Sequence, residues 1–150
     1  ENHYYESLED PYEAKNKPFD SLQELRLIKG LENETYNKVQ KFLTVQSDGW
    51  INMNTAGKEM IMSLSDDLSG EIADEILAFR VENPFPTKQD FKNNISMSED
   101  VYNEISKFVD VKSNYFSIIS RGEVNQSQKI IRAVVMRQNN KANILYWRVE

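Results

Sequence analysis

Apolar residues recur at helical spacing through most of the first two thirds of the chain. Ser21 followed three positions later by Glu24 is a capping-box pattern, and it predicts a helix that Gly30 closes in the left-handed conformation. Similar polar caps, together with Pro84 and Pro86 as stops, set the bounds of the later helices. We expect these helices over residues 33–43, 57–64, 70–81 and 98–108. Asn54 or Thr55 should cap the helix over 57–64, Ser69 the helix over 70–81, and Ser98 the helix over 98–108. A short turn capped by Thr87 and Asp90 should precede the last helix.

After Lys112 the pattern changes to three runs rich in β-branched and aromatic residues, over 115–121, 129–138 and 142–149. Residues 139–141 form a tight polar turn, so the last two runs should pair as an antiparallel hairpin, and a polar loop over 122–128 joins the first two. The chain therefore predicts an α+β protein. It consists of an extended lead-in over residues 1–20, a compact helical domain over 21–111 and a small antiparallel β-sheet over 112–150.

The charged residues divide at the same boundary. The whole chain holds 18 Lys and Arg against 24 Asp and Glu, a net charge of −6. Residues 1–111 carry a net charge of −11, whereas residues 112–150 carry +5. An acidic surface repels the phosphate backbone of DNA or RNA at physiological salt, so we expect no nucleic-acid partner for the helical part.

The composition leaves few catalytic chemistries. The chain has no cysteine and a single histidine, His3, at its start, which disfavours disulfides, thiolate zinc sites, cysteine nucleophiles and histidine-based triads. Its carboxylates fall mostly at helix starts or on polar faces, so we expect no enzyme and name no catalytic residue. No apolar run is long enough for a transmembrane span or signal peptide, and we interpret the chain, which opens on Glu1, as an excised soluble piece.

The helical part contains a loose internal repeat. Residues 21–31 and 55–64, each with the helix that follows, resemble a helix-hairpin-helix (SAM-like) unit, in which two short helices flank a glycine-bearing turn. In DNA-binding members the backbone N–H groups of the turn bind a phosphate. Here Glu32 stands in the first turn, and Asp66 and Asp67 in the second, where like charge opposes an anion. We expect a helical scaffold, with a helix-hairpin-helix nucleic-acid-binding module as the alternative.

Four stretches resemble, in the right order, one protein family. They are NKPFDSL and ELRLIKG within 16–30, INMNTA over 51–56, Arg80 with NPF at 83–85 and DF at 90–91, and SNYF over 113–116. The first two are similar to N-x-P-F-D-S-x-x-E-L-R-x-x-x-G, and the third to I-N-x-N-T-A, of the K-type minor pseudopilins of bacterial type II secretion systems (general secretion pathway protein K). The resemblance runs from about residue 12 to the end of the chain.

The resemblance implies a non-enzymatic, pilin-like protein whose antiparallel sheet carries a large helical insertion. It implies a place at the tip of a short pseudopilus, formed with the I-type and J-type minor pseudopilins, and exported proteins are further candidate partners. The implied location is the bacterial periplasm, with anchoring in the inner membrane before assembly through an N-terminal hydrophobic helix that is not in this chain. No cofactor is required, and calcium is implied only because some members bind it in the helical domain.

The residues themselves give little support to a calcium site. Asp48, Asn52 and Asn54 place oxygen atoms in one loop, and Asp66 with Asp67 in another. Calcium takes about six to eight oxygen ligands, usually from alternate positions of a dedicated loop, which neither stretch offers. We therefore expect Asn52 and Asn54 to hydrogen-bond backbone groups at a turn and a helix start.

Aromatic residues are the candidate interaction sites, because Tyr and Trp are enriched at the energetic centres of interfaces. We select Tyr4, Tyr5, Trp50 and Trp147 as interface candidates, and expect Tyr12 to pack the lead-in onto the body. Tyr146 and Trp147 point to opposite faces of the last strand, so at most one lies in a core. The basic residues of the sheet are expected to be solvated, with docking of an acidic partner as the alternative; they are Lys129, Arg132, Arg137, Lys141 and Arg148.

Overall fold

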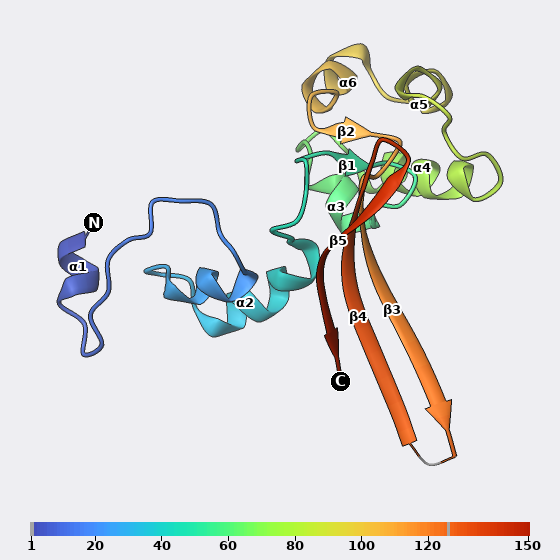
Figure 1. The fold of residues 1–150 in the computed structure, drawn as a ribbon. Helices are drawn as coiled ribbons and strands as arrows, with labels where there is room; N and C mark the ends of the chain where they lie inside the picture. The colour runs from blue at the N-terminus through green and yellow to red at the C-terminus, as the bar shows by residue number, and fades with distance from the viewer. Residues whose placement is uncertain (1, 126) are drawn as a thin grey trace. The chain divides into compact units, whose positions relative to one another are not determined.

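The computed structural model describes residues 2–125 and 127–150, and its helices and strands are labelled in Figure 1. The chain divides into two compact units, Glu1–Val45 and Gln46–Glu150. This division differs from the lead-in, helical domain and sheet expected over residues 1–20, 21–111 and 112–150, which stay a prediction about folding units. Among the described residues, no helix is long and apolar enough to cross a lipid bilayer.

The first unit is built from short helices and contains a small aromatic cluster. Its elements are α1 (Asn2–Glu6), the 3-10 helix η1 (Leu22–Leu27), α2 (Asn33–Val39) and the 3-10 helix η2 (Gln40–Phe42). The expectation of a wholly extended lead-in is wrong at its start, where α1 forms. Tyr5 of α1 is buried, and its ring lies 5.0 Å from the ring of Tyr12. This aromatic contact, which has no periodic signal in the sequence, packs the helical turn onto the rest of the unit.

The predicted capping box starts η1. The carboxylate of Glu24 accepts hydrogen bonds from the backbone N–H groups of Ser21 (2.9 Å) and Asp20 (2.8 Å). Gly30 has the expected left-handed conformation, with φ +84°. The segment is nevertheless a 3-10 helix rather than an α-helix, and it ends early because the backbone of Ile28 is already extended.

The helices of the second unit enclose one hydrophobic core. Their order is β1 (Ile51–Asn52), α3 (Lys58–Met62), α4 (Gly70–Glu82), α5 (Lys88–Asn94), α6 (Glu99–Ile105) and β2 (Val109–Asp110). The core side chains with no exposed surface are Met53, Ile61, Ala73, Ile76, Phe91, Ile105 and Val109. β1 and β2 pair in parallel and bring the two ends of this segment together. The sequence does not predict this pair, because strands of two residues carry no periodicity.

The predicted polar caps start three of these helices. The side-chain oxygens of Ser69, Thr87 and Ser98 accept hydrogen bonds from backbone N–H groups three positions later, at 3.2–3.3 Å. α4 therefore matches the helix expected over residues 70–81, and α5 is a helix where only a short turn was expected.

Several helix boundaries differ from the expectation. The helix expected over residues 33–43 is an α-helix only to Val39 and continues as η2, and the one expected over 57–64 ends at Met62. α3 begins after Gly57, not after Asn54 or Thr55, because the side chain of Asn54 bonds other segments instead of the helix start. α6 ends at Ile105 rather than at residue 108, because the chain there turns into β2. A capping residue therefore predicts the start of a helix when its side chain has no other hydrogen-bond partner. Asn54 has such partners, and the prediction from it was wrong.

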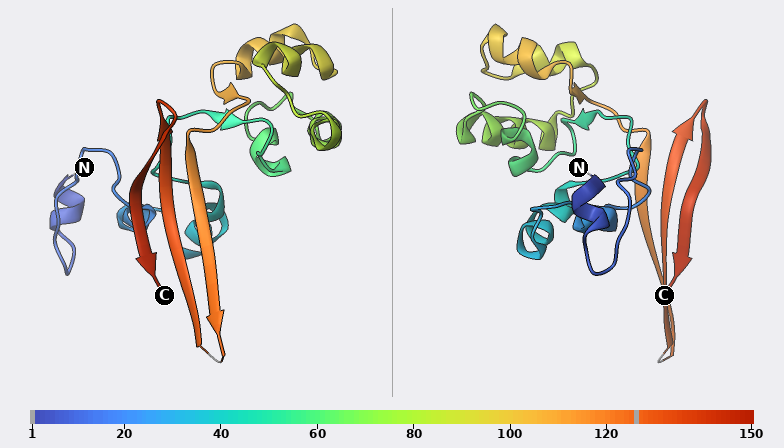
Figure 2. Two further views of the ribbon diagram at one scale, coloured as in Figure 1. Left: turned by 45° about the vertical axis from the view of Figure 1, so that its right-hand side comes forward. Right: turned by 90° about the vertical axis from the view of Figure 1, so that its left-hand side faces the viewer.

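The last part of the chain is the expected antiparallel sheet. β3 (Tyr115–Val124), β4 (Ser127–Gln138) and β5 (Lys141–Val149) lie in the order β3-β4-β5. Asn139 and Asn140 both have positive φ, 51° and 58°, as a tight two-residue hairpin turn requires. The β3–β4 turn lies at the end of the sheet remote from the helices of this unit (Figures 1 and 2).

The polar loop expected over residues 122–128 is wrong at both ends. Glu123 pairs with Gln128, and Val124 pairs with Ser127, so the strands continue almost to the turn. Residue 126 of that loop lies outside the described residues. Polar side chains do not interrupt these strands because both faces of this end of the sheet are exposed to solvent.

Asn54 joins three segments of the second unit through its side chain. Its Nδ2 donates to the carbonyl oxygens of Phe85 and Val111, each at 2.9 Å, and its Oδ1 accepts from the N–H of Phe85 at 2.8 Å. Asn52 supports this arrangement, because its Oδ1 accepts from the N–H of Asn54 at 2.9 Å and its Nδ2 donates to Ser113 Oγ at 2.8 Å. Both asparagines hydrogen-bond backbone groups as expected, and Asn52 does so at a turn, but Asn54 bonds two distant segments rather than the helix start.

Arg80 of α4 holds the same loop from the other side. Its Nη1 donates to the carbonyl oxygens of Met53 (2.8 Å) and Ala56 (2.7 Å). Partial burial lowers the pKa of Arg80, but an arginine stays charged in a folded protein. The stretches INMNTA and NPF and the arginine therefore form one hydrogen-bonded support for the fold.

We expect Asn54→Asp to destabilise the second unit. The carboxylate keeps the shape of the side chain but has no N–H for the carbonyl oxygens of Phe85 and Val111. A buried polar group left without its partner costs about 1–3 kcal/mol, so the free energy of unfolding in urea should fall by about 2–4 kcal/mol. Asn103→Asp, the same change at an exposed side chain, should cost less than about 0.5 kcal/mol. Equal effects of the two changes would contradict the role of Asn54.

The Glu24 carboxyl gives the first unit a pH dependence. A hydrogen bond from Lys15 Nζ (2.8 Å), with the backbone bonds to Ser21 and Asp20, lowers the pKa of Glu24. Because the folded pKa is the lower one, the stabilisation is complete above the ordinary glutamate pKa and is lost as the pH falls through the lowered value. NMR titration should show Lys15→Gln raising the pKa of Glu24 and Lys38→Gln leaving it unchanged. An unchanged value in both variants would contradict the pairing.

Candidate interaction surface

One face of the β3-β4-β5 sheet is both apolar and exposed. Residues directly opposite each other in antiparallel strands lie on the same face, and the register places together a set that we call the apolar face. It consists of Phe116, Ile118, Ile131, Ala133, Val135, Ile144, Trp147 and Val149. Ser120 lies among them on the same side of the sheet, and Lys129 and Arg137 lie toward its two ends. Within this set only Val135, 9% exposed, is buried, whereas Ile118 is 47% and Trp147 61% exposed. A folded chain rarely leaves so many large apolar side chains together in water.

A β-bulge in β5 keeps the apolar face continuous. Val134 pairs with Tyr146 but Val135 pairs with Ile144, so Leu145 is an extra residue in β5. Without the bulge, Ile144 and Trp147 would point to opposite faces, because they are separated by an odd number of positions. Tyr146 lies on the other face and is half exposed, so neither it nor Trp147 lies in a core of the described chain.

The opposite face of the sheet, which we call the basic face, is mixed in character. It presents three arginines among apolar side chains; its members include Ile119, Arg121, Arg132, Val134, Tyr146 and Arg148. Arg132 and Arg148 are directly opposed on β4 and β5, and the carboxylate of Glu150 pairs with both of them, at 3.1 Å from Arg132 Nε. The hydrogen bond from Arg132, followed by the charge of Arg148, lowers the pKa of Glu150. The glutamate thus offsets the repulsion between two arginines on neighbouring strands.

Arg137 differs from the other sheet cations. Its guanidinium lies 5.4 Å from the ring centroid of Phe116, and its Nη2 donates to the carbonyl oxygen of Ser113 at 2.8 Å. It therefore fixes the chain at the entrance to the sheet while staying exposed to solvent, as expected.

The tyrosines of the first unit divide into one exposed and two packed side chains. Tyr4 is exposed, with Lys29 Nζ 4.0 Å from its ring centroid. Tyr5 is only 7% exposed, and its hydroxyl accepts a hydrogen bond from the N–H of Lys29 at 3.3 Å. The hydroxyl of Tyr12 donates to the carbonyl oxygen of Leu27, which confirms that Tyr12 packs the lead-in onto the body. Of the two tyrosines selected as interface candidates, Tyr4 alone has a largely accessible ring.

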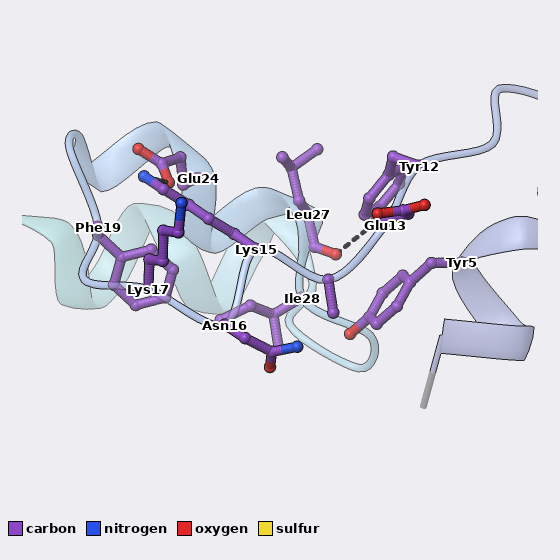
Figure 3. Close-up of a pocket in the computed structure, with 11 residues that line it drawn as sticks. Tyr5, Tyr12, Glu13, Lys15, Asn16, Lys17, Phe19, Glu24, Leu27 and Ile28 are labelled. Carbon is purple, nitrogen blue, oxygen red and sulfur yellow. Dashed lines mark hydrogen bonds and ion pairs between the residues drawn. The ribbon is translucent and has the colours of Figure 1, made fainter.

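A cavity of about 330 Å³ lies beside these tyrosines in the first unit (Figure 3). Its lining is mostly apolar and includes Tyr5, Tyr12, Phe19, Leu27 and Ile28. Two of the charged groups that line it are paired, since Lys15 Nζ contacts Glu24 at 2.8 Å and also Asp20 at 2.6 Å. The cavity could therefore hold an apolar side chain of another molecule by contact alone.

Trp50, the fourth interface candidate, immediately precedes β1 and is 45% exposed. Lys88 Nζ lies 4.9 Å from its ring centroid. Trp50 and Trp147 are therefore both accessible, on different parts of the second unit.

No metal site is built by the acidic side chains of residues 2–125 and 127–150, because no three of their His, Asp or Glu residues lie close enough together to hold an ion. In the first of the two loops considered for calcium, the side-chain oxygens of Asp48, Asn52 and Asn54 accept hydrogen bonds within the chain. Asp48 accepts hydrogen bonds from the N–H of Trp50 (3.4 Å) and from Asn114 Nδ2 (3.1 Å). Calcium binding in the helical domain stays a prediction.

Selection by residue type found only one member of the apolar face, Trp147. The alternation of Phe116 with Ile118, and of Ile131 with Ala133 and Val135, was a signal that one face is apolar. An apolar sheet face is ordinarily covered by the rest of its own chain, so alternation by itself does not reveal exposure. That property comes from the placement of the sheet, which extends away from the helices of this unit (Figure 2).

Family models match the chain over two segments. Both are described as type II secretion system (T2SS) protein K, and they match residues 1–48 and 51–112. Type II secretion system protein K of Pseudomonas aeruginosa is 27% identical over 132 residues, and that of Aeromonas hydrophila is 26% identical over 152 residues. The matches cover 87% and 97% of this chain but 38% and 46% of those relatives, so the chain spans less than half of their length.

A solved structure shares the fold. It is the crystal structure of the GspK-GspI-GspJ complex from the type 2 secretion system of enterotoxigenic Escherichia coli. One of its chains matches 100% of this chain with a TM-score of 0.66 and 18% identity, over 55% of its own length. This likeness shows a shared mixed helix-and-strand fold.

The exposure of the apolar face predicts a contrast between two isoleucines. Ile118→Ala should change the free energy of unfolding in urea by less than about 1 kcal/mol, because the side chain is nearly half exposed. Ile61→Ala removes the same atoms from a fully buried site and should cost about 2–5 kcal/mol. A comparable loss at Ile118 would show that the face is buried in solution.

Proposed function

The chain belongs to the type II secretion system protein K family, the K-type minor pseudopilins, and we propose that it acts as a structural protein at the tip of a pseudopilus. It works through contacts with the I-type and J-type minor pseudopilins and so supports protein export. We also propose that exported proteins touch this tip complex, and that the chain catalyses no reaction.

The observation that carries this proposal is the exposed apolar face. Six of its side chains are at least 40% exposed: Phe116, Ile118, Ile131, Ile144, Trp147 and Val149. Burying apolar surface is the main favourable term in protein association, at about 25 cal/mol for each Å² removed from water. A continuous apolar sheet face therefore suits a protein whose role is to be covered by other protein surfaces of an assembly.

Two further observations support an assembly role. The shared fold is that of a chain crystallised in a three-protein complex of a type 2 secretion system. The carboxylates of the helices serve as caps and ion-pair partners, such as Asp90 at the start of α5 and Glu99 opposite Lys92 at 2.6 Å. These roles are structural and suit a scaffold.

The family supports a proposal about the location of the protein. We propose that the protein works in the bacterial periplasm and is held in the inner membrane before assembly through the hydrophobic helix that characterises the family. We also propose that the helices keep helix-hairpin-helix-like geometry as a scaffold only. The turn between α3 and α4 carries Asp66 and Asp67, whose charge opposes a phosphate group.

The test is to place one charge on the apolar face. Ile118→Glu in the complete protein should weaken co-purification with the I-type and J-type minor pseudopilins of the same secretion system at least tenfold, because a carboxylate would have to be buried at the contact. Protein export should fall with it. Val81→Glu is the matched control, because Val81 is an exposed apolar residue on α4. Normal binding and export by Ile118→Glu, at unchanged protein level, would overturn the proposal.

A further inference from the structure

Two aromatic rings and two lysines form a second surface on the helical part, distant in sequence from the sheet. We call it the aromatic–lysine patch, and it consists of Trp50, Lys88, Lys107 and Phe108. The N–H of Ile51 donates to the carbonyl oxygen of Phe108 at 2.8 Å, so Trp50 and Phe108 lie next to each other where β1 meets β2.

Both aromatic rings lie outside the hydrophobic core. Ile51 pairs with Val109, and both pack in that core. Trp50 and Phe108 immediately precede these two residues in the chain, and neither is part of the core. Each ring is 45% exposed.

The two lysines are held against these rings. Lys88 Nζ lies 4.9 Å from the ring centroid of Trp50 and donates to the carbonyl oxygen of Ser106 at 2.7 Å, which ties α5 to the segment that carries Lys107 and Phe108. Lys107 Nζ lies 5.0 Å from the ring centroid of Phe108. Cation–π contacts of this kind place a positive charge over an exposed aromatic face.

The charge around the patch makes it unusual. Residues 46–111 contain 13 acidic and 5 basic side chains, a net charge of −8. Of the other three cations, Lys58 pairs with Asp74, Lys92 pairs with Glu99, and Arg80 donates to backbone carbonyls. Within the part of the chain that the structure describes, Lys88 and Lys107 make no ion pair with a carboxylate. Arg80 also has no acidic partner, but its guanidinium is held by two backbone carbonyls, so the two lysines of residues 46–111 that make no ion pair both belong to this patch.

We propose that the aromatic–lysine patch binds an acidic segment of a neighbouring minor pseudopilin. Carboxylates of the segment pair with the two ammonium groups, and an apolar side chain beside them packs on the rings of Trp50 and Phe108. The proposal rests on the assembly function proposed above and assigns it a second contact, separate from the apolar face.

The surrounding charge selects this kind of partner. A short peptide segment brings its few carboxylates only to the patch, whereas a nucleic acid would extend its phosphates over the acidic helices and be repelled. Tryptophan is among the residues whose removal costs most at an interface. The two lysines mainly raise the association rate with an acidic surface and orient the two molecules, and this effect weakens as the salt concentration rises because ions screen the charges.

The experiment measures binding of the complete chain to purified I-type and J-type minor pseudopilins at low and high salt. Trp50→Ala should weaken binding at least tenfold. Lys107→Gln should weaken it several-fold at low salt and reduce the salt dependence of the dissociation constant. Lys41→Gln is the matched control, since Lys41 also lies over an aromatic ring, 4.6 Å from the centroid of Phe42. Thermal melting checks that Trp50→Ala folds, and Lys107→Gln removes no hydrogen bond recorded for its side chain.

The outcomes separate this inference from the proposed function. If Trp50→Ala and Lys107→Gln bind both pseudopilins as the unchanged chain does while Ile118→Glu does not, the patch inference is overturned and the proposed function stands. If the unchanged chain binds neither pseudopilin, both fail. Patch-dependent binding of a single-stranded oligonucleotide, or patch-dependent dimerisation in ultracentrifugation, would likewise overturn the inference in favour of another partner.

Discussion

The second unit depends on the side-chain amide of Asn54. Its donors and its acceptor join the loop after β1 to Phe85, beyond the end of α4, and to Val111, just before the sheet. An amide suits this position because it satisfies both carbonyl and N–H groups at once, which neither a carboxylate nor an apolar side chain does. With Arg80 bonding the same loop, the segment from β1 to β2 and the four helices within it are closed into one body, and β1 and β2 bring its two ends together. The sheet follows directly after β2.

The helical part and the sheet of the second unit differ in how far they bury their apolar side chains. The helical part buries its large apolar side chains, including Phe91 and Ile105, within its own core. The sheet exposes most of its apolar side chains, and Val135 alone among the residues of the apolar face is buried. The helical part can consequently be stable by its own contacts, whereas the sheet leaves apolar side chains in contact with water, which costs about 25 cal/mol for each Å². Trp50, 45% exposed, is an exception within the helical part.

Local chemistry in the sequence predicted much of this fold, and long-range contacts account for the rest. Ser69, Thr87 and Ser98 act within one helical turn, so their pattern predicts helix starts directly. The β1–β2 pair, the bulge at Leu145 and the helix at Asn2–Glu6 depend on partners distant in sequence, which periodicity does not contain. Trp147 was selected as an aromatic residue, but the apolar face around it required the register. The family resemblance pointed to the stretches INMNTA and NPF and to Arg80, and the structure shows that these residues are joined by hydrogen bonds.

The turn at Asn139 and Asn140 has a consequence for the order of folding. Two consecutive left-handed residues fix the register of β4 against β5 through contacts that are close in the sequence, so this hairpin can form quickly. The β1–β2 pair instead joins positions far apart in the sequence, so its closure costs more chain entropy. Because a shift of one residue would turn every side chain of β5 to the other face of the sheet, the make-up of the apolar face depends on two asparagines that are not part of it.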